Sequence, residues 1–249
     1  MTQIYKEIEA LQVTAHRGSS RDAPENTISA INLAIQDEAD YVEIDVQQTK
    51  DGKLVVLHDS NLQRVAGINQ HIGELDWEEV RQLDVGSWFS AKFTAERIPL
   101  LEEVIKTTKD KIKLNIELKF NGHEQKLATE VVKLVAEQEF VEQCVISSAN
   151  YPALLKVKEL NPQIATGLII PTALPTVAEF KVDFYSVRSA IATIDFINQA
   201  HAQGKQVHVW TINEITEMET FLNRRVDNII TDTPKTLRRL LPNCSRILT

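Results

Sequence analysis

Short apolar runs rich in β-branched residues recur along the chain, and most precede a segment whose apolar positions return every three or four residues. The first pattern is typical of buried strands and the second of amphipathic helices. Eight strands are predicted, at residues 13–16, 41–46, 113–118, 144–147, 165–169, 184–187, 206–210 and 228–231. The helices predicted between them cover residues 27–36, 100–108, 124–137, 153–160, 194–203 and 214–223.

The alternation of strands with helices decides the predicted fold class. Parallel neighbours need a crossover of about a dozen residues or more, which a helix provides. Eight such units in 249 residues match a closed α/β fold, the (β/α)8 TIM barrel. An open doubly wound sheet is the alternative, but no glycine-rich dinucleotide motif follows the first predicted strand.

One segment departs from this alternation. Asp51-Gly52 separates the second strand from another apolar run at residues 54–58, and Asp-Gly between two such runs is typical of a hairpin. We therefore expect an extra antiparallel strand over residues 54–58, folded back on the second strand. A turn centred on Asp51-Gly52 would bring His58 beside Asp45.

An insertion at residues 59–98 then precedes the next helix. Within it, residues 77–83 are predicted as a short helix that Asp76 caps, with Glu79 completing a capping box. No linker or change of composition separates this segment from the rest of the chain. We therefore expect a single barrel domain over residues 1–249, with the insertion as a small cap at the mouth of the barrel.

Composition and charge narrow the range of functions. The 27 basic and 35 acidic side chains give a net charge of −8, which disfavours binding to a nucleic-acid backbone. An anionic substrate would need local cations or a metal ion. Cys144 and Cys244 make no disulfide pattern, no apolar run approaches the length of a membrane span, and the N-terminus lacks a signal-peptide pattern. We expect a soluble, cytoplasmic protein, and the oligomeric state stays open.

Three acidic residues indicate a metal site. Glu43 and Asp45 lie two positions apart on the second strand, so both side chains point to one side, and Glu117 lies at the end of the third barrel strand. Two carboxylates inside a barrel cannot both stay ionised without a positive partner. A hard divalent cation, Mg²⁺ or Ca²⁺, is the simplest partner. The alternatives are solvent-exposed acids, or ion pairs with Arg17 and Lys119 and no metal.

Two histidines, two cations and a tryptophan are expected around these acids. His16 and His58 each end a strand beside them, where imidazoles can serve as general acid and base; packed structural histidines are the alternative. Arg17 and Lys119 are predicted to bind phosphate oxygens. Trp210 ends a later strand and is predicted to form a wall of the pocket, with a tryptophan of the core as the alternative.

These residues belong to an ordered set of motifs. The motifs are His16-Arg17-Gly18, Pro24-Glu25-Asn26-Thr27, Glu43-Ile44-Asp45-Val46, Thr49-Lys50-Asp51-Gly52, Val55-Val56-Leu57-His58-Asp59, Glu117-Leu118-Lys119, Val209-Trp210-Thr211-Ile212-Asn213 and Val226-Asp227-Asn228-Ile229-Ile230-Thr231-Asp232-Thr233-Pro234. From about Val13 to Leu240, the chain resembles the glycerophosphodiester phosphodiesterases. One departure is Arg225, at a position where the family usually has glycine.

The resemblance implies a barrel enzyme that hydrolyses glycerophosphodiesters to glycerol 3-phosphate and an alcohol. The family's catalytic, phosphate-binding and metal-binding positions are filled here by His16 and His58, by Arg17 and Lys119, and by Glu43, Asp45 and Glu117, respectively. We expect the metal to be Mg²⁺ or Ca²⁺. Water and the substrate's own glycerol 2-hydroxyl both stay open as the nucleophile.

Other readings of the same residues remain. A related barrel phosphodiesterase acting on phosphoinositides or sphingolipids would share this chemistry, although residues 24–27 and Glu117-x-Lys119 favour the first reading. A barrel that binds phosphodiesters without cleaving them is the other rival, but it would not need two such histidines. Residues 68–90 resemble family members fused to a membrane-embedded region. An extracellular catalytic domain of a membrane-anchored protein is therefore the alternative to a cytoplasmic enzyme.

Overall fold

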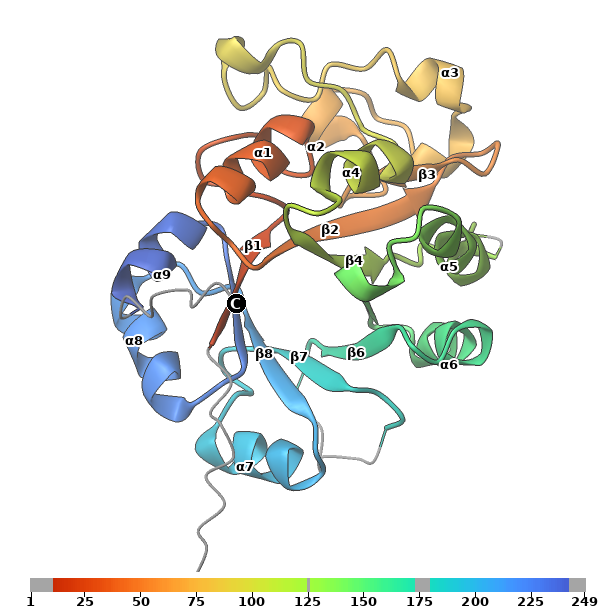
Figure 1. Cartoon of the computed structure of the whole chain (residues 1–249). Coiled ribbons are helices and arrows are strands. Elements are labelled where there is room, and N and C mark those ends of the chain that lie inside the picture. The colour runs from red at the N-terminus through yellow and green to blue at the C-terminus, as the bar shows by residue number, and fades with distance from the viewer. Residues whose placement is uncertain (1–10, 125, 173–179, 242–249) are drawn as a thin grey trace, which may run out of the picture.

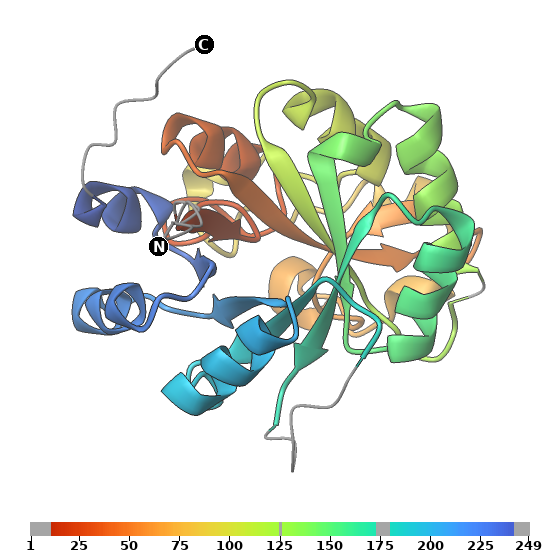
Figure 2. The same cartoon turned by 60° about the horizontal axis from the view of Figure 1, so that its bottom comes forward.

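The computed structural model describes residues 11–124, 126–172 and 180–241, and its parallel strands close into a barrel (Figures 1 and 2). The barrel strands are β1 (Gln12–His16), β2 (Tyr41–Gln48), β4 (Lys113–Leu118), β5 (Cys144–Ser148), β6 (Ala165–Ile170), β7 (Phe184–Arg188), β8 (Gln206–Trp210) and β9 (Asn228–Thr231). Each pairs with the next, and β9 pairs with β1. The predicted TIM barrel is confirmed.

Helices surround the barrel on its outside (Figure 2). They are α1 (Ile28–Gln36), α4 (Leu101–Thr108), α5 (Leu127–Glu137), α6 (Tyr151–Leu160), α7 (Ile194–Ala202), α8 (Ile215–Arg224) and α9 (Pro234–Leu240). Their apolar faces and the strands share one hydrophobic core. Helix α5 begins later than predicted, because the Glu124 carboxylate instead accepts hydrogen bonds from the backbone N–H groups of Asn121 and Gly122 in the preceding loop.

Strand register brings the predicted site residues to one end of the barrel. His16 on β1 lies opposite Glu43 on β2, and Asp45 on β2 lies opposite Glu117 on β4. His16 ends β1 and Glu117 is the last but one residue of β4, so this group lies toward the carboxyl end of the barrel, where barrels of this type hold their active sites.

The extra strand β3 (Leu54–Val56) pairs antiparallel with β2 and lies outside the ring. The hairpin prediction is confirmed, but the register differs by one residue and the strand stops short of His58. The buried Gln47 side chain explains the early end. Its amide nitrogen donates to the backbone carbonyls of residues 57–59 and so turns them out of the strand pairing.

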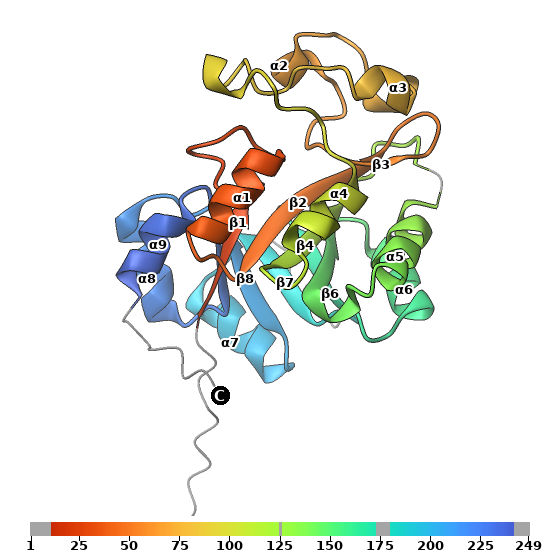
Figure 3. The ribbon, with the colours of Figure 1, turned by 45° about the horizontal axis from the view of Figure 1, so that its top comes forward.

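The insertion lies beyond the carboxyl end of β2, next to β3 (Figure 3). It contains α2 (Gln63–Ala66), η1 (Ile72–Glu74), α3 (Trp77–Val80) and η2 (Ala91–Phe93). Leu62, Ile72 and Val80 belong to a second hydrophobic cluster, separate from the barrel core. Asp76 is the N-cap residue of α3 as predicted, and its N–H donates to Glu79 at 2.9 Å, but the Asp76 side chain makes no capping hydrogen bond and the helix is shorter than expected.

Cys144 is a buried free thiol, and burial raises its pKa to about 12. Cys244 lies outside the described residues. Within the part of the chain that the structure describes, no helix combines the length and the apolar character needed to cross a membrane.

Candidate active site

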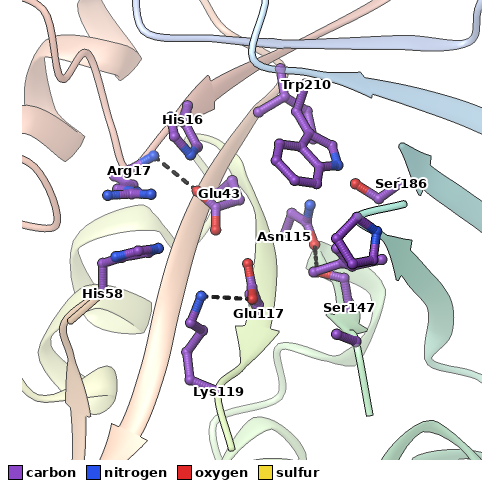
Figure 4. A pocket seen from close by; sticks show the side chains of 14 residues that line it. His16, Arg17, Glu43, His58, Asn115, Glu117, Lys119, Ser147, Ser186 and Trp210 are labelled. Atoms are coloured by element: carbon purple, nitrogen blue, oxygen red, sulfur yellow. Dashed lines mark hydrogen bonds and ion pairs between the residues drawn. The ribbon is translucent and has the colours of Figure 1, made fainter. Parts of the chain in front are cut away.

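Glu43, Asp45 and Glu117 form an acidic cluster at the carboxyl end of the barrel, partly drawn in Figure 4. Each offers one carboxylate oxygen, and these oxygens all lie within 4.8 Å of one another. Glu43 and Asp45 are only 5% and 1% exposed, so the alternative of solvent-exposed acids is wrong. Because Mg²⁺ and Ca²⁺ prefer oxygen ligands, this cluster can hold a divalent cation.

The electrostatic balance differs among the three acids. Burial, followed by the charges of Asp45 and Glu117, raises the pKa of Glu43 well above its usual value. Burial acts in the same sense on Asp45, but the charges of Lys119, Arg17 and His58 and a hydrogen bond from Asn26 together outweigh it and lower the pKa of that carboxyl. The Nζ of Lys119 lies 2.9 Å from Glu117 and 3.4 Å from Asp45. These ion pairs leave Glu43 short of positive charge, and a bound cation would supply it.

The turn after β1 places Arg17 beside the acids. Arg17 and Gly18 both have left-handed backbone, with φ of 57° and 86°. A side chain at Gly18 would come within 2.6 Å of Ala30, so glycine is required there. The Arg17 N–H then donates to Glu43 at 3.0 Å, and its guanidinium lies 3.4 Å from Asp45.

His16 is held by a carboxylate from the opposite end of the sequence. Its Nδ1 lies 2.7 Å from Asp232, which also accepts hydrogen bonds from Ser20 at 3.0 Å and Asn213 at 2.6 Å. A carboxylate can only accept, so we assign the ring proton to Nδ1. This assignment leaves Nε2 of His16 to exchange a proton with a ligand.

His58 has the same kind of support. Its Nδ1 lies 2.8 Å from Asp59. Burial lowers the pKa of His58, and the charges of Arg17 and Lys119 lower it further. The charge of Asp45 and the hydrogen bond to Asp59 raise it, but the net shift is downward. A lowered pKa keeps the imidazole neutral at pH 7 and able to accept a proton.

One cavity of about 240 Å³ connects these groups. All the predicted site residues except Asp45 line it. Asp45 is more deeply buried and accepts a hydrogen bond from Asn26 Nδ2 at 2.8 Å. Trp210 lines the cavity, with the Arg188 guanidinium 5.3 Å from its ring centroid, so it is a wall residue.

The side of the cavity away from His58 carries three polar side chains among apolar ones (Figure 4). Asn115, Ser147 and Ser186 line it beside Trp210, and Ser147 Oγ donates to Asn115 at 2.9 Å. Hydroxyl and amide groups in such positions can bind the hydroxyls of a small polyol.

Residues 16–236 match the model of the glycerophosphoryl diester phosphodiesterase family. The chain belongs to this family. It is 37% identical to a glycerophosphodiester phosphodiesterase of Caldanaerobacter subterraneus over 239 residues, covering 92% of this chain and 97% of the relative. A solved phosphodiesterase of Oleispira antarctica, in complex with the product sn-glycerol-3-phosphate, is 32% identical with a TM-score of 0.86 and covers 92% of this chain and 95% of its own.

A more distant relative carries a different activity name. A lysophospholipase D of Rattus norvegicus is 28% identical over 274 residues, covering 93% of this chain and 86% of the relative. Membership of the glycerophosphoryl diester phosphodiesterase family makes the present chain a phosphoric diester hydrolase, as the sequence resemblance implied.

The sequence alone indicated no role for Asp59 and Asp232, the two acids that contact Nδ1 of His58 and His16. Asp59 directly follows His58, and an acid next to a candidate catalytic histidine was a usable signal. Asp232 directly follows β9, and the carboxyl end of a barrel strand is itself a signal for a site residue. Glu25, which accepts a hydrogen bond from Arg17 at 2.9 Å, belongs to the motif at residues 24–27 and was likewise given no role in the site.

Proposed function

We propose that this glycerophosphodiester phosphodiesterase releases glycerol 3-phosphate and an alcohol by acid–base catalysis from His16 and His58. One observation carries the proposal. Both imidazoles, each with Nδ1 on a carboxylate, line the same cavity as Glu43, Glu117 and Arg17. A barrel that only binds phosphodiesters would have no use for two histidines supported in this way.

The cofactor we propose is Mg²⁺ or Ca²⁺, held by Glu43, Asp45 and Glu117. An all-carboxylate set suits these hard ions better than Zn²⁺, which favours histidine and cysteine. When bound, the ion would neutralise charge on the phosphodiester and polarise a phosphoryl oxygen. The raised pKa of Glu43 supports this proposal, because a carboxylate site that retains protons is one that a cation can stabilise.

Arg17 and Lys119 are the proposed phosphate-binding residues. Both line the cavity, and both already contact Asp45 at 3.4 Å, which fixes their positions before substrate arrives. Their remaining N–H groups can donate to the non-bridging phosphate oxygens. The wall formed by Trp210, with the side chains of Asn115, Ser147 and Ser186 beside it, is the proposed place for the glycerol moiety.

The two histidines are assigned opposite tasks. His58, with its lowered pKa, takes the proton from the attacking oxygen of water or of the glycerol 2-hydroxyl. His16 gives a proton to the departing alkoxide, because the Asp232 carboxylate behind it stabilises the imidazolium. The new P–O bond forms as the bond to the alcohol breaks, and each histidine ends in the state in which the other began. With water as the nucleophile this step yields glycerol 3-phosphate directly. With the 2-hydroxyl it yields a cyclic phosphate, which water then opens to glycerol 3-phosphate with the tasks of the two histidines reversed.

A coupled assay for glycerol 3-phosphate tests the proposal, with glycerophosphocholine and glycerophosphoethanolamine as substrates. We expect release that a chelator abolishes and that Mg²⁺ or Ca²⁺ restores. Binding of glycerophosphocholine without product, with metal present, would favour a non-catalytic barrel. Faster choline release from lysophosphatidylcholine than from glycerophosphocholine would favour the phospholipase-type activity named for the rat relative.

A further inference from the structure

Arg64, on helix α2 of the insertion, joins the two carboxylates that stand behind His58 and Arg17. Its Nε lies 2.6 Å from Oδ2 of Asp59, and its Nη1 and Nη2 lie 2.8 Å and 2.7 Å from the two oxygens of Glu25. Asp59 in turn is 2.8 Å from Nδ1 of His58, and Glu25 is 2.9 Å from Nη1 of Arg17. The Arg64 guanidinium therefore contacts His58 through one intervening side chain, Asp59, and Arg17 through another, Glu25.

We propose that Arg64 is a positioning residue through which the insertion aligns His58 and Arg17 for the reaction; this inference rests on the function proposed above. The guanidinium has a planar fork of five donors, and three of its nitrogens are engaged here. A point charge such as lysine cannot reproduce that arrangement.

The contact with Glu25 sets how Arg17 meets the substrate. Oε1 of Glu25 accepts from both Arg17 and Arg64, so the two cations share one carboxylate charge. Without Arg64, Glu25 would be left to Arg17 alone and would compete with the phosphodiester for it. Loss of Arg64 should therefore weaken binding of the anionic substrate.

The contact with Asp59 sets how His58 meets the reacting oxygen. The Asp59 side chain is 30% exposed, so it needs a second partner to stay in one orientation. Arg64 is that partner, and its own guanidinium carbon lies 5.5 Å from the ring centroid of Trp88 on the insertion. Loss of Arg64 should therefore also slow the chemical step.

The test is steady-state kinetics of the full chain with glycerophosphocholine and saturating divalent cation. For Arg64→Ala we expect kcat to fall about tenfold and KM to rise about tenfold, the usual scale for a misplaced catalytic group. A merely structural role would reduce the amount of folded enzyme, which lowers the apparent kcat and leaves KM unchanged. Arg81→Ala is the matched control, because Arg81 is an exposed insertion arginine paired with Glu78.

Arg64→Lys separates charge from geometry. We expect it to recover most of the substrate affinity, because the charge beside Glu25 is kept, but to leave kcat about tenfold low. Wild-type kinetics of Arg64→Ala, in an enzyme that His58→Ala inactivates, would overturn the role of Arg64 alone. An unchanged KM in Arg64→Ala would also overturn it. A wild-type chain that releases no glycerol 3-phosphate would overturn the proposed function and this role together.

Discussion

The Nδ1 atom of His16 lies 2.7 Å from Oδ1 of Asp232, although the two residues are 216 positions apart. Closure of the barrel causes this meeting, because β1 and β9 are neighbouring parallel strands. Burial alone would raise the pKa of Asp232, but hydrogen bonds from His16, Asn213 and Ser20 hold it below its usual value. Asp232 is therefore an anion at neutral pH, and its carboxylate accepts the Nδ1 proton of His16.

Replacing Asp232 with asparagine should lower kcat by about 10²-fold and change KM little, because only the imidazolium of His16 loses its counter-charge. Steady-state release of glycerol 3-phosphate measures the effect. The matched control is Asp227→Asn, which alters a similar 2.8 Å pair with His201 at the other end of β9. A wild-type kcat in the Asp232 variant would contradict the orienting role of this carboxylate.

Removing either imidazole should have a larger effect. His16→Ala and His58→Ala are each expected to lower turnover by roughly 10²–10⁴-fold, the contribution of a positioned general acid or base. Thermal unfolding of both variants should match that of the wild type, because both side chains line a cavity and not the core. His201→Ala, at an ion-paired histidine on α7, should retain full activity. Near-normal turnover in both variants would rule out the two-histidine mechanism.

Most of the barrel and its acids could be predicted from local pattern. The period-two repeat places Glu43 and Asp45 on the same face of one strand, and parallel pairing with the next barrel strand brings Glu117 level with Asp45. The Asp51-Gly52 turn likewise predicts the hairpin from adjacent residues alone. In each case, the interacting groups are connected by a regular repeat or a short turn.

Contacts that depend on barrel closure or on loop packing could not be predicted. Periodicity does not specify that Asp232 meets His16, or that Arg64 meets Glu25 across 39 positions. The end of β3 was misplaced for a related reason. The apolar run continues to Leu57, but a side-chain amide on the neighbouring strand takes the carbonyls that pairing would have used.

A divalent cation should stabilise the protein more at pH 8 than at pH 5. Burial raises the pKa of both Glu43 and Glu117, so a cation must displace protons from them at low pH. One displaced proton changes the binding free energy by about 1.4 kcal/mol per pH unit, and about 1 kcal/mol shifts Tm by roughly 2–4 °C in a chain of this size. We expect the Mg²⁺- or Ca²⁺-induced rise in Tm to be several degrees greater at pH 8.

The direction of this pH dependence follows from the linkage of proton binding to folding. A carboxyl whose folded pKa is raised contributes stability below its unfolded pKa, about 4.5, and loses it as pH rises through the folded value. Asp45 has a lowered pKa, so its contribution is lost only below 3.8, outside this window. Glu43→Gln should reduce the metal effect and its pH dependence, whereas Glu102→Gln, on the exposed face of α4, should not. An equal metal-induced shift at both pH values would argue against this carboxylate site.

Arg225→Gly should stabilise the fold. Arg225 ends α8 in the left-handed region, with φ of 59°, and its N–H donates to the Leu222 carbonyl, the geometry in which glycine commonly ends a helix. The left-handed backbone costs a residue with a side chain about 1–2 kcal/mol. The greater freedom of glycine in the unfolded chain offsets about 0.5–1 kcal/mol of that. We expect a net gain of about 0.5–1 kcal/mol, which is a rise in Tm of roughly 1–4 °C.

The matched control for this variant is Asn223→Gly, two residues earlier on the same helix. Asn223 is exposed like Arg225 but lies within the helix, so glycine there should be neutral or destabilising. Both variants should keep wild-type kcat and KM, since neither position lines the cavity. Opposite shifts of Tm, measured by scanning calorimetry, would show that backbone conformation at Arg225 is responsible. Equal destabilisation by both would mean that the Arg225 side chain contributes more than its backbone strain costs.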